Sequence, residues 1–348
     1  MLSKEPVIIF RADGNPQIGS GHIMRCLSIA DAAREQGIEN CFLTAEDFFA
    51  AIIRERGFAC EVLQTDYRDM DAEQKKLSVI LEKYEPESIV ADSYFVTPEY
   101  LVFLSRFAEV TYIDDLASFA YPVKRVVNYN IYGPDLDYAA LYSKAGVPLP
   151  QLLLGPHYAP LRRQFQNLPP RAVRQKVQDI LVSTGGADAQ HIALQLAQYL
   201  SGQGSLEDVQ YHFVAGAMNA DLPALQAIAR QCAAIRVHQN VQNMARLMRQ
   251  CDLAIAAAGS TLYELCACGV PTVTYAFADN QLLGMRAFEK QGVMVGAGDV
   301  RSLHIPLEVI TSRVEEVSLN YKNRKRLASK MQRLVDGSGA GRIVNYIR

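Results

Sequence analysis

The sequence predicts an α/β protein made of two doubly wound domains, and three observations point to this fold class. The chain has 348 residues, which exceeds the roughly 100 to 200 residues of one ordinary domain. Short apolar and β-branched runs alternate with segments of helical spacing, a pattern typical of parallel sheets flanked by helices. The alternation restarts after a proline-containing, charge-rich stretch at 167–176. We therefore expect two sheets in succession.

The expected strands of the first sheet lie at 7–10, 41–43, 88–91 and 110–113. Those of the second sheet lie at 180–183, 211–215, 253–257 and 272–275. The resulting prediction is an N-terminal domain at 1–168 and a C-terminal domain at 169–348. Open parallel sheets bind ligands at the carboxyl ends of their strands, so we expect the active site in the cleft between the domains.

Composition excludes several classes of protein. Thirty-five Lys and Arg stand against 37 Asp and Glu, without the basic excess typical of a nucleic-acid partner. No segment approaches the roughly 20 consecutive apolar residues that span a bilayer, so membrane insertion is not expected. The seven cysteines are odd in number and scattered, and no secretory signal is visible, which favours the cytoplasm. The oligomeric state is not predicted.

The sequence contains no clustered His and Cys residues with the spacing of a metal site, so we expect no metal and no cofactor. The Gly-x-Ser-x-Gly motif of serine hydrolases does not follow any predicted strand. The Lys- and Arg-rich segment 321–333 is interpreted as a solvated helix.

The first predicted strand is followed by the glycine-rich segment RADGNPQIGSGHIMRC (11–26). Its glycines, Gly19 and Gly21 among them, allow backbone amides to approach an anionic or polar ligand. The phosphate-binding Walker motif fails because Ser20 stands where Lys is required. The dinucleotide motif fails because Met24 stands where Gly or Ala is required. ATPase and dehydrogenase functions are therefore disfavoured.

His22 lies where this loop becomes a helix, and a neutral imidazole there is suited to take a proton from water. The alternative is a histidine that only caps the helix or packs under the loop. Four carboxylates, Asp13, Asp92, Asp114 and Asp115, lie at or just after strand ends. One of them could orient His22 or bind a sugar hydroxyl, although each taken alone is more typical of a turn residue.

Two glycine turns follow strands in the second half, one with Gly185 and Gly186 and the other with Gly259, Ser260 and Thr261. Both are predicted to open helices. Unpaired amides at a helix start, together with the helix dipole, suit a diphosphate group.

Glu264 lies on the second of these predicted helices, on the side opposite Leu262, Leu265, Cys266 and Gly269. A carboxylate in that position can accept two hydrogen bonds side by side from a ribose diol. The alternative is an ordinary solvated glutamate.

Together these segments resemble the UDP-sugar hydrolases of pseudaminic acid biosynthesis, called PseG, which are relatives of the glycosyltransferase MurG. The resemblance covers RADGNPQIGSGHIMRC, the DSY at 92–94, the IDD at 113–115, the segment 154–162, and AAGSTLYELCACGVP with Asn280 and Gln281. It implies two Rossmann-like domains in the GT-B arrangement. It also implies hydrolysis of UDP-2,4-diacetamido-2,4,6-trideoxy-β-L-altropyranose, in which water displaces UDP at the anomeric carbon.

The resemblance also implies roles for individual residues. The catalytic set is His22 as general base, with Tyr94 and Asn280 at the sugar. The substrate- and UDP-binding set is Asp13, Gly19, Gly21, Arg25, Gly185, Gly186, Gly259, Ser260, Thr261, Glu264 and Gln281. Three alternatives stay open: a MurG-like transferase, a hydrolase of a related nucleotide-linked diacetamido sugar, and a binding module that has no use for His22.

Overall fold

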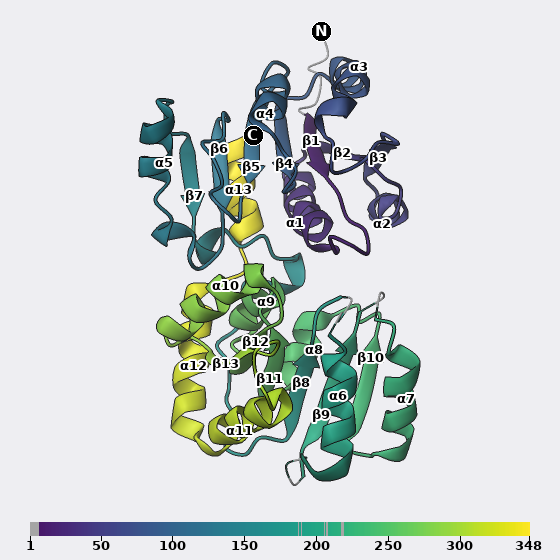
Figure 1. Ribbon diagram of the computed structural model, residues 1–348, viewed down its shortest axis with the longest axis vertical. Helices are drawn as coiled ribbons and strands as arrows, with labels where there is room; N and C mark the ends of the chain where they lie inside the picture. Colours follow the sequence, from purple (N-terminus) through teal and green to yellow (C-terminus); the bar gives the residue numbers. More distant parts are fainter. Residues whose placement is uncertain (1–6, 187, 189, 205, 207, 217–218) are drawn as a thin grey trace. The chain divides into compact units, whose positions relative to one another are not determined.

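The protein folds into two compact units, which are described separately (Figure 1). The computed structural model describes residues 7–186, 188, 190–204, 206, 208–216 and 219–348. The first unit comprises Met1–Arg163 and Ser338–Arg348, and the second comprises Gln164–Gly337.

A seven-stranded, entirely parallel sheet forms the centre of the first unit, in the order β3-β2-β1-β4-β5-β6-β7. Its strands are β1 (Val7–Ala12), β2 (Glu39–Thr44), β3 (Ala59–Val62), β4 (Ser88–Asp92), β5 (Glu109–Ile113), β6 (Arg125–Asn128) and β7 (Gln151–Leu154). The direction in which strands are added reverses between β1 and β4. In open α/β sheets, a ligand site lies beyond the carboxyl ends of the strands at such a reversal.

Helices join these strands, and short 3₁₀ turns complete the connections. The helices are α1 (Gly21–Glu35), α2 (Ala50–Glu55), α3 (Gln74–Tyr84), α4 (Pro98–Leu104), α5 (Tyr138–Ala145) and α13 (Gly339–Ile347). The 3₁₀ turns are η1 (Asp71–Glu73), η2 (Gly133–Asp135), η3 (Pro156–Tyr158) and, at the boundary of the unit, η4 (Arg163–Phe165). Local sequence fixes several helix ends: the Thr97 side chain accepts a hydrogen bond from the Tyr100 amide to cap α4, and Gly146 ends α5 in the left-handed conformation.

The second unit repeats the same topology with six parallel strands in the order β10-β9-β8-β11-β12-β13. The strands are β8 (Asp179–Ser183), β9 (Gln210–Ala215), β10 (Ile235–Gln239), β11 (Leu253–Ala257), β12 (Thr272–Ala276) and β13 (Val295–Asp299). The helices are α6 (Ile192–Tyr199), which continues into the π-helical turn η5 (Leu200–Gly204), α7 (Leu222–Gln231), α8 (Met244–Gln250), α9 (Thr261–Cys268), α10 (Asp279–Lys290), α11 (Pro306–Leu319) and α12 (Tyr321–Leu334). Its reversal point lies between β8 and β11.

The predicted α/β class and every predicted strand are confirmed. The sequence pattern missed β3, β6, β7, β10 and β13, which are short and lie toward or at the sheet edges. Edge positions tolerate polar residues, as in the Ile235–Gln239 strand, so the apolar run that marks a central parallel strand is absent there.

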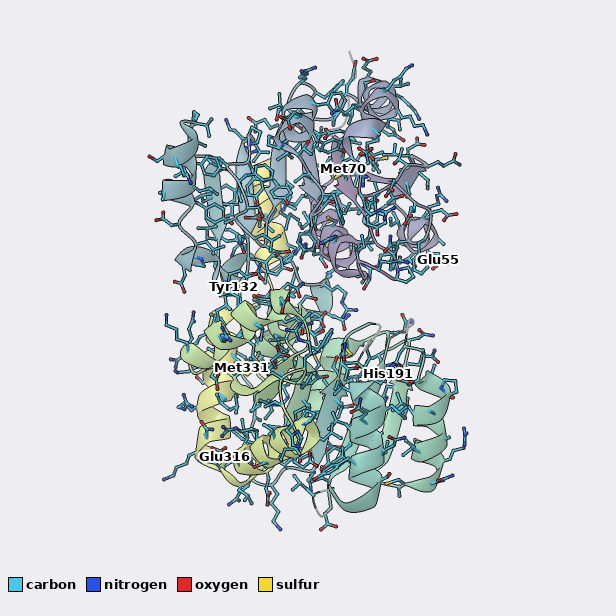
Figure 2. The ribbon with its side chains drawn as sticks, viewed as in Figure 1. Glu55, Met70, Tyr132, His191, Glu316 and Met331 are labelled. Atoms are coloured by element: carbon cyan, nitrogen blue, oxygen red, sulfur yellow. The ribbon has the colours of Figure 1, made fainter. Side chains whose placement is uncertain are left out.

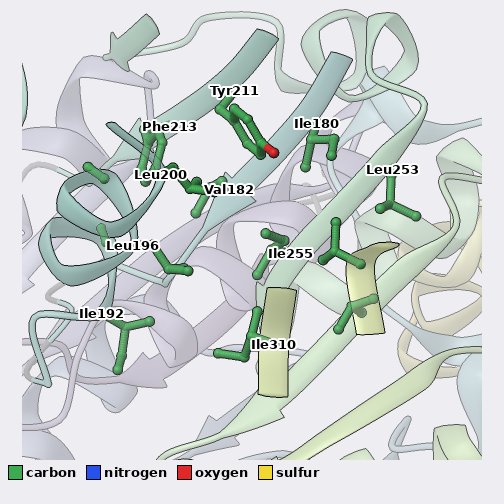
Figure 3. Packing of buried hydrophobic residues seen from close by; sticks show 14 of the residues in the cluster. Ile180, Val182, Ile192, Leu196, Leu200, Tyr211, Phe213, Leu253, Ile255 and Ile310 are labelled. Carbon is green, nitrogen blue, oxygen red and sulfur yellow. The ribbon is translucent and has the colours of Figure 1, made fainter. Parts of the chain in front are cut away.

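The core of the second unit forms on one face of its sheet (Figure 3). Alternate residues on neighbouring strands, Ile180, Val182, Tyr211, Phe213, Leu253 and Ile255, cluster with residues of helices α6 and α11. The helix residues include Ile192, Leu196 and Ile310. The first unit has an equivalent cluster built on β1, β4 and β5. Among the described residues, no helix combines the length and the apolar character needed to cross a bilayer.

Helix α12 is not uniformly solvated, and this corrects the interpretation of segment 321–333. Arg324 is fully buried and donates hydrogen bonds to the backbone carbonyls of Ser318, Arg174 and Gln175. Met331 on the same helix is also buried, whereas Glu316 on α11 is exposed at the surface (Figure 2). The Arg324 guanidinium satisfies carbonyls that a solvated arginine would leave unpaired.

The C-terminal helix α13 belongs to the first unit, although the predicted boundary assigned all residues after 168 to the second. It contacts α1 and η3, segments far away in sequence (Figure 1). Its apolar residues Ile343, Val344 and Ile347 are buried. An apolar helical face does not specify which sheet it covers, so the sequence alone did not identify this partner.

We predict that Gly339→Ala destabilises the docking of α13. A Cβ atom at this position would lie 2.6 Å from the backbone nitrogen of Ala159, so the helix must shift away. We expect a loss of about 1 to 3 kcal/mol, measured as a lower Tm by circular dichroism and as faster amide exchange in α13.

Gly341→Ala is the matched control for this change, because a Cβ there meets nothing within 4 Å. It should leave stability unchanged or raise it by up to about 1 kcal/mol through helix propensity. Equal effects of the two variants would contradict the close packing of Gly339.

Candidate functional site

The loop after β1 is closed by its own hydrogen bonds before α1 begins. The Gly19 amide donates to the Asn15 carbonyl at 2.8 Å, and Gly19 has the positive φ of 77° that favours glycine. The Asn15 side chain accepts from the amides of Gln17 and Ile18, each at 3.0 Å. The loop therefore delivers Gly21, which is exposed, to the first position of α1.

His22 lies at the start of α1, beside the carboxyl end of β4. It is 7% exposed, and its Nε2 atom lies 4.0 Å from Oδ1 of Asp92. The Tyr94 ring meets the imidazole edge-on with a centroid separation of 4.7 Å. Burial lowers the pKa of His22 below its ordinary 6.5, and the Arg25 charge adds to this, while Asp92 opposes it. The imidazole is therefore mostly neutral at pH 7 and able to accept a proton.

Arg25 lies one turn further along α1, and its guanidinium joins two carboxylates. Its Nε and Nη2 atoms donate to the two oxygens of Asp92, both at 2.6 Å. Its Nη1 atom donates to Asp115 at 3.0 Å and to the Tyr129 hydroxyl at 3.0 Å. Arg25 is 8% exposed and Asp92 is fully buried, so water competes little with these bonds.

Asp115 connects Arg25 to the exposed edge of the site. It accepts hydrogen bonds from the Tyr94 hydroxyl at 2.9 Å and from the Asn130 amide at 2.7 Å. Burial alone would raise the pKa of Asp115, but Arg25 and these donors hold it below its ordinary value. The Tyr94 ring is 42% exposed, and its position at the edge of the site allows it to contact a ligand.

Asp13 and Asp114, the other two predicted carboxylates, each lie in a separate buried network. Asp13 accepts from Arg11 at 2.5 Å and from the Ala45 amide at 2.7 Å, which ties the end of β1 to the end of β2. Asp114 accepts from the hydroxyls of Tyr121 and Tyr138. Asp13 is 4% exposed and directly precedes Gly14 at the start of the loop.

Sequence reasoning did not identify the polar and aromatic residues that follow β6. Tyr129 and Asn130 reach the Arg25 and Asp115 pair, and the Tyr132 hydroxyl donates to the Asp115 carbonyl at 3.0 Å. The segment NYNIYG directly after an apolar pair was the available signal. It was overlooked because β6 itself was not predicted.

In the second unit, the two glycine turns lie at the carboxyl ends of the neighbouring strands β8 and β11. Gly185 has a φ of 91°, and Gly186 is packed so closely that a Cβ on Gly216 would overlap its backbone. The first turn does not open a helix directly, which corrects the prediction. Helix α6 begins only at Ile192, after a longer loop.

Asp188 caps α6 from within this loop. Its carboxylate accepts from the amides of Ile192 at 3.1 Å and Ala193 at 2.8 Å, which are among the first amides of the helix. The Nδ1 atom of His191 (Figure 2) lies within hydrogen-bond distance, 2.6 Å, of Oδ2 of Asp221. The helix start that was expected to face a diphosphate is therefore already occupied by a carboxylate.

The second turn opens α9 as predicted. Gly259 and Ser260 are exposed, and Thr261 is the first helical residue. Helix α9 is buried on most sides, because Tyr263 is buried together with the predicted inward face. Glu264 is half-buried rather than fully solvated.

Asn280 and Gln281 lie in the first turn of α10. The Gln281 side chain accepts a hydrogen bond from the Phe277 amide at 3.0 Å, so it shapes the entry to the helix. Asn280 is exposed. Across the described part of the chain, no group of three or more His, Cys, Asp or Glu residues is arranged to hold a metal ion.

The structure thus places the predicted residues in two groups. His22, Arg25 and Tyr94 come together at the reversal point of the first sheet, and Asp13 lies directly after β1, before the segment that carries Gly19 and Gly21. The glycine turns lie at the reversal point of the second sheet, with the helix that carries Glu264 beginning there.

Comparison with known proteins gives relatives in sequence and in structure. No family model matches the chain. It is 23% identical over 345 residues to the spore coat polysaccharide biosynthesis protein SpsG of Bacillus subtilis, covering 97% of this chain and 96% of that protein. It is 25% identical over 260 residues to a UDP-2,4-diacetamido-2,4,6-trideoxy-β-L-altropyranose hydrolase of Campylobacter jejuni, covering 74% and 86%.

Solved structures share the fold along the whole chain. MurG of Acinetobacter baumannii matches with a TM-score of 0.69 and 15% identity, covering 98% of this chain and 99% of that protein. The spinosyn rhamnosyltransferase SpnG, complexed with thymidine diphosphate, matches with a TM-score of 0.65 and 14% identity, covering 99% and 100%. The chain therefore has the two-sheet α/β fold of the GT-B glycosyltransferases.

Proposed function

We propose that this protein hydrolyses UDP-2,4-diacetamido-2,4,6-trideoxy-β-L-altropyranose to UDP and the free sugar, with His22 as the general base. The observation that carries the proposal is the buried imidazole of His22, whose pKa burial lowers, beside the partly exposed Tyr94 at the reversal point of a parallel sheet. The sequence similarity to the Campylobacter jejuni hydrolase of that substrate supports the choice of reaction.

We assign a separate role to each of the two groups of residues. The second unit binds the nucleotide through the exposed turn of Gly259, Ser260 and Thr261, with Glu264 at the ribose and Gly185 and Gly186 at the diphosphate. The thymidine diphosphate in the SpnG structure supports a nucleoside diphosphate as the ligand of this fold. His22 and Tyr94, both in the first unit, are proposed to act at the sugar.

The chemistry requires one proton acceptor. A water molecule attacks the anomeric carbon as the His22 imidazole takes its proton, so a carbon–oxygen bond forms. The bond from that carbon to the diphosphate oxygen breaks, and UDP leaves with the electron pair. A neutral base is needed for this step, and the burial of His22 provides it.

A glycosyltransferase is the second candidate, and the whole-chain fold likeness to MurG and SpnG favours it. In that case the same base would deprotonate an acceptor hydroxyl instead of water. Incubation with UDP-linked amino sugars, followed by mass spectrometry, separates the two functions. Release of free sugar in buffer alone supports hydrolysis, whereas turnover that depends on an added acceptor supports transfer.

We predict that His22→Asn lowers kcat by about 10² to 10⁴-fold, the usual contribution of a positioned base, with little change in UDP affinity. His304→Asn, an exposed histidine of the second unit, is the matched control and should behave as wild type. In the wild type, kcat/KM should rise with pH through a midpoint below 6.5, because the base works only when deprotonated and burial lowers its pKa. Activity of His22→Asn within about threefold of wild type would exclude base catalysis by His22.

We predict that Glu264→Ala raises KM for the nucleotide sugar and weakens UDP inhibition by about tenfold or more. The change removes charge-assisted hydrogen bonds to the ribose, each worth roughly 1.5 to 3 kcal/mol. Steady-state kinetics with UDP as inhibitor measures both effects. Glu316→Ala, an exposed glutamate on α11, serves as control. An unchanged KM in Glu264→Ala would place this residue outside the nucleotide site.

A further inference from the structure

Asp92 is shared unequally between Arg25 and His22. Both of its oxygens accept from Arg25 at 2.6 Å. The nearest approach to His22 is 4.0 Å from Oδ1 to Nε2, beyond the range of a direct hydrogen bond. The carboxylate therefore influences the imidazole through its charge without holding its proton.

We propose that Arg25 is a positioning residue for His22: by engaging both oxygens of Asp92, it prevents a direct bond between that carboxylate and Nε2 of the imidazole. The Nε2 atom then stays available to accept a proton from the attacking water. This chemical role rests on the proposed function, whereas the clamp on Asp92 does not.

The guanidinium is itself fixed in place. Its Nη1 atom donates to Asp115 and to the Tyr129 hydroxyl, both at 3.0 Å. Asp115 in turn accepts from the Tyr94 hydroxyl, and the Tyr94 ring packs edge-on against His22. One side chain thus sets the position of both the carboxylate and the aromatic ring that border the imidazole.

Arg25 has little capacity left for a ligand. Of its five N–H groups, the Nε group and one on Nη2 bind Asp92, and Nη1 binds Asp115 and Tyr129. The side chain is also 8% exposed. These contacts favour an internal positioning role over the direct substrate contact that the family resemblance implied.

The electrostatic reason for such a clamp follows from the groups that face His22. Among the described residues, the charges that act on the pKa of His22 are the carboxylates of Asp92 on β4, Asp115 after β5 and Asp13 after β1, and the guanidinium of Arg25 on α1. A direct hydrogen bond from the imidazolium N–H to a carboxylate stabilises the charged form and raises the pKa of a histidine. With Asp92 held by Arg25, burial dominates and the pKa of His22 is lowered.

The test is an NMR titration of His22 in the free protein, in the wild type and in two variants. In Arg25→Gln, Asp92 is released and a cation is lost, so the pKa of His22 should rise by about one unit or more. In Asp92→Asn, the negative charge is lost while the shape is kept, so the pKa of His22 should fall below the wild-type value. The rise in Arg25→Gln combines the lost cation with the released carboxylate, so a charge-conserving variant is needed to separate the two effects.

Controls on the same helix use residues outside the site. Arg34→Gln and Asp31→Asn remove equivalent charges from the surface pair between Arg34 and Asp31, and neither should move the His22 titration. Arg25→Lys keeps the charge but cannot form the two-pronged bond to Asp92. It should raise the pKa of His22 by less than Arg25→Gln, and it provides a second variant if Arg25→Gln does not fold.

An unchanged or lower pKa of His22 in Arg25→Lys would overturn the clamp, because this variant keeps the positive charge and loses only the two-pronged bond to Asp92. The clamp and the hydrolase function can be tested independently, because the titration needs no substrate. A raised pKa of His22 in both Arg25 variants without any hydrolysis of the UDP sugar would keep the clamp and reject the function. Hydrolysis with a His22 titration that does not respond to Arg25 would keep the function and reject the clamp.

Discussion

The buried ion pair between Arg25 and Asp92 is the interaction on which the first unit's site depends. It joins α1 to the end of β4 across 67 residues of sequence. Removing two charges from water is costly unless their hydrogen bonds are satisfied. Here both carboxylate oxygens and most of the guanidinium are bonded. The pair therefore fixes the rotation of α1, and with it the direction in which His22 points.

A second constraint comes from the parallel sheets. All strands of each sheet end at the same edge, so the polar residues that follow them gather there. In the first unit this brings together residues that follow β1, β4, β5 and β6, and in the second it brings together the turns after β8 and β11. The sheet is the rigid framework, and the loops at its edge carry the polar side chains of the candidate sites.

The fold was predictable where local pattern and tertiary role agree. Central strands such as Leu253–Ala257 are buried on both faces and therefore appear as apolar runs. Edge strands such as Ala59–Val62 are only partly buried and contain charged residues, so the pattern is weak. Arg324 was mispredicted for a different reason. It lies in a basic segment that was interpreted as solvated, and nothing in the sequence distinguishes it as the arginine that is buried and donates to the backbone carbonyls of Arg174 and Gln175.

The sequence by itself determined the residue types of the candidate site: a histidine after a glycine loop, four aspartates at strand ends, and two glycine turns in the second half. Only the tertiary structure decided how the aspartates divide, with Asp92 and Asp115 on Arg25 while Asp13 and Asp114 are taken up by other partners. It also decided that α13 covers the first unit. The physical reason is the same in both cases. Charge and apolarity determine that a group needs a partner, whereas the choice among partners depends on which strands and helices lie together in space.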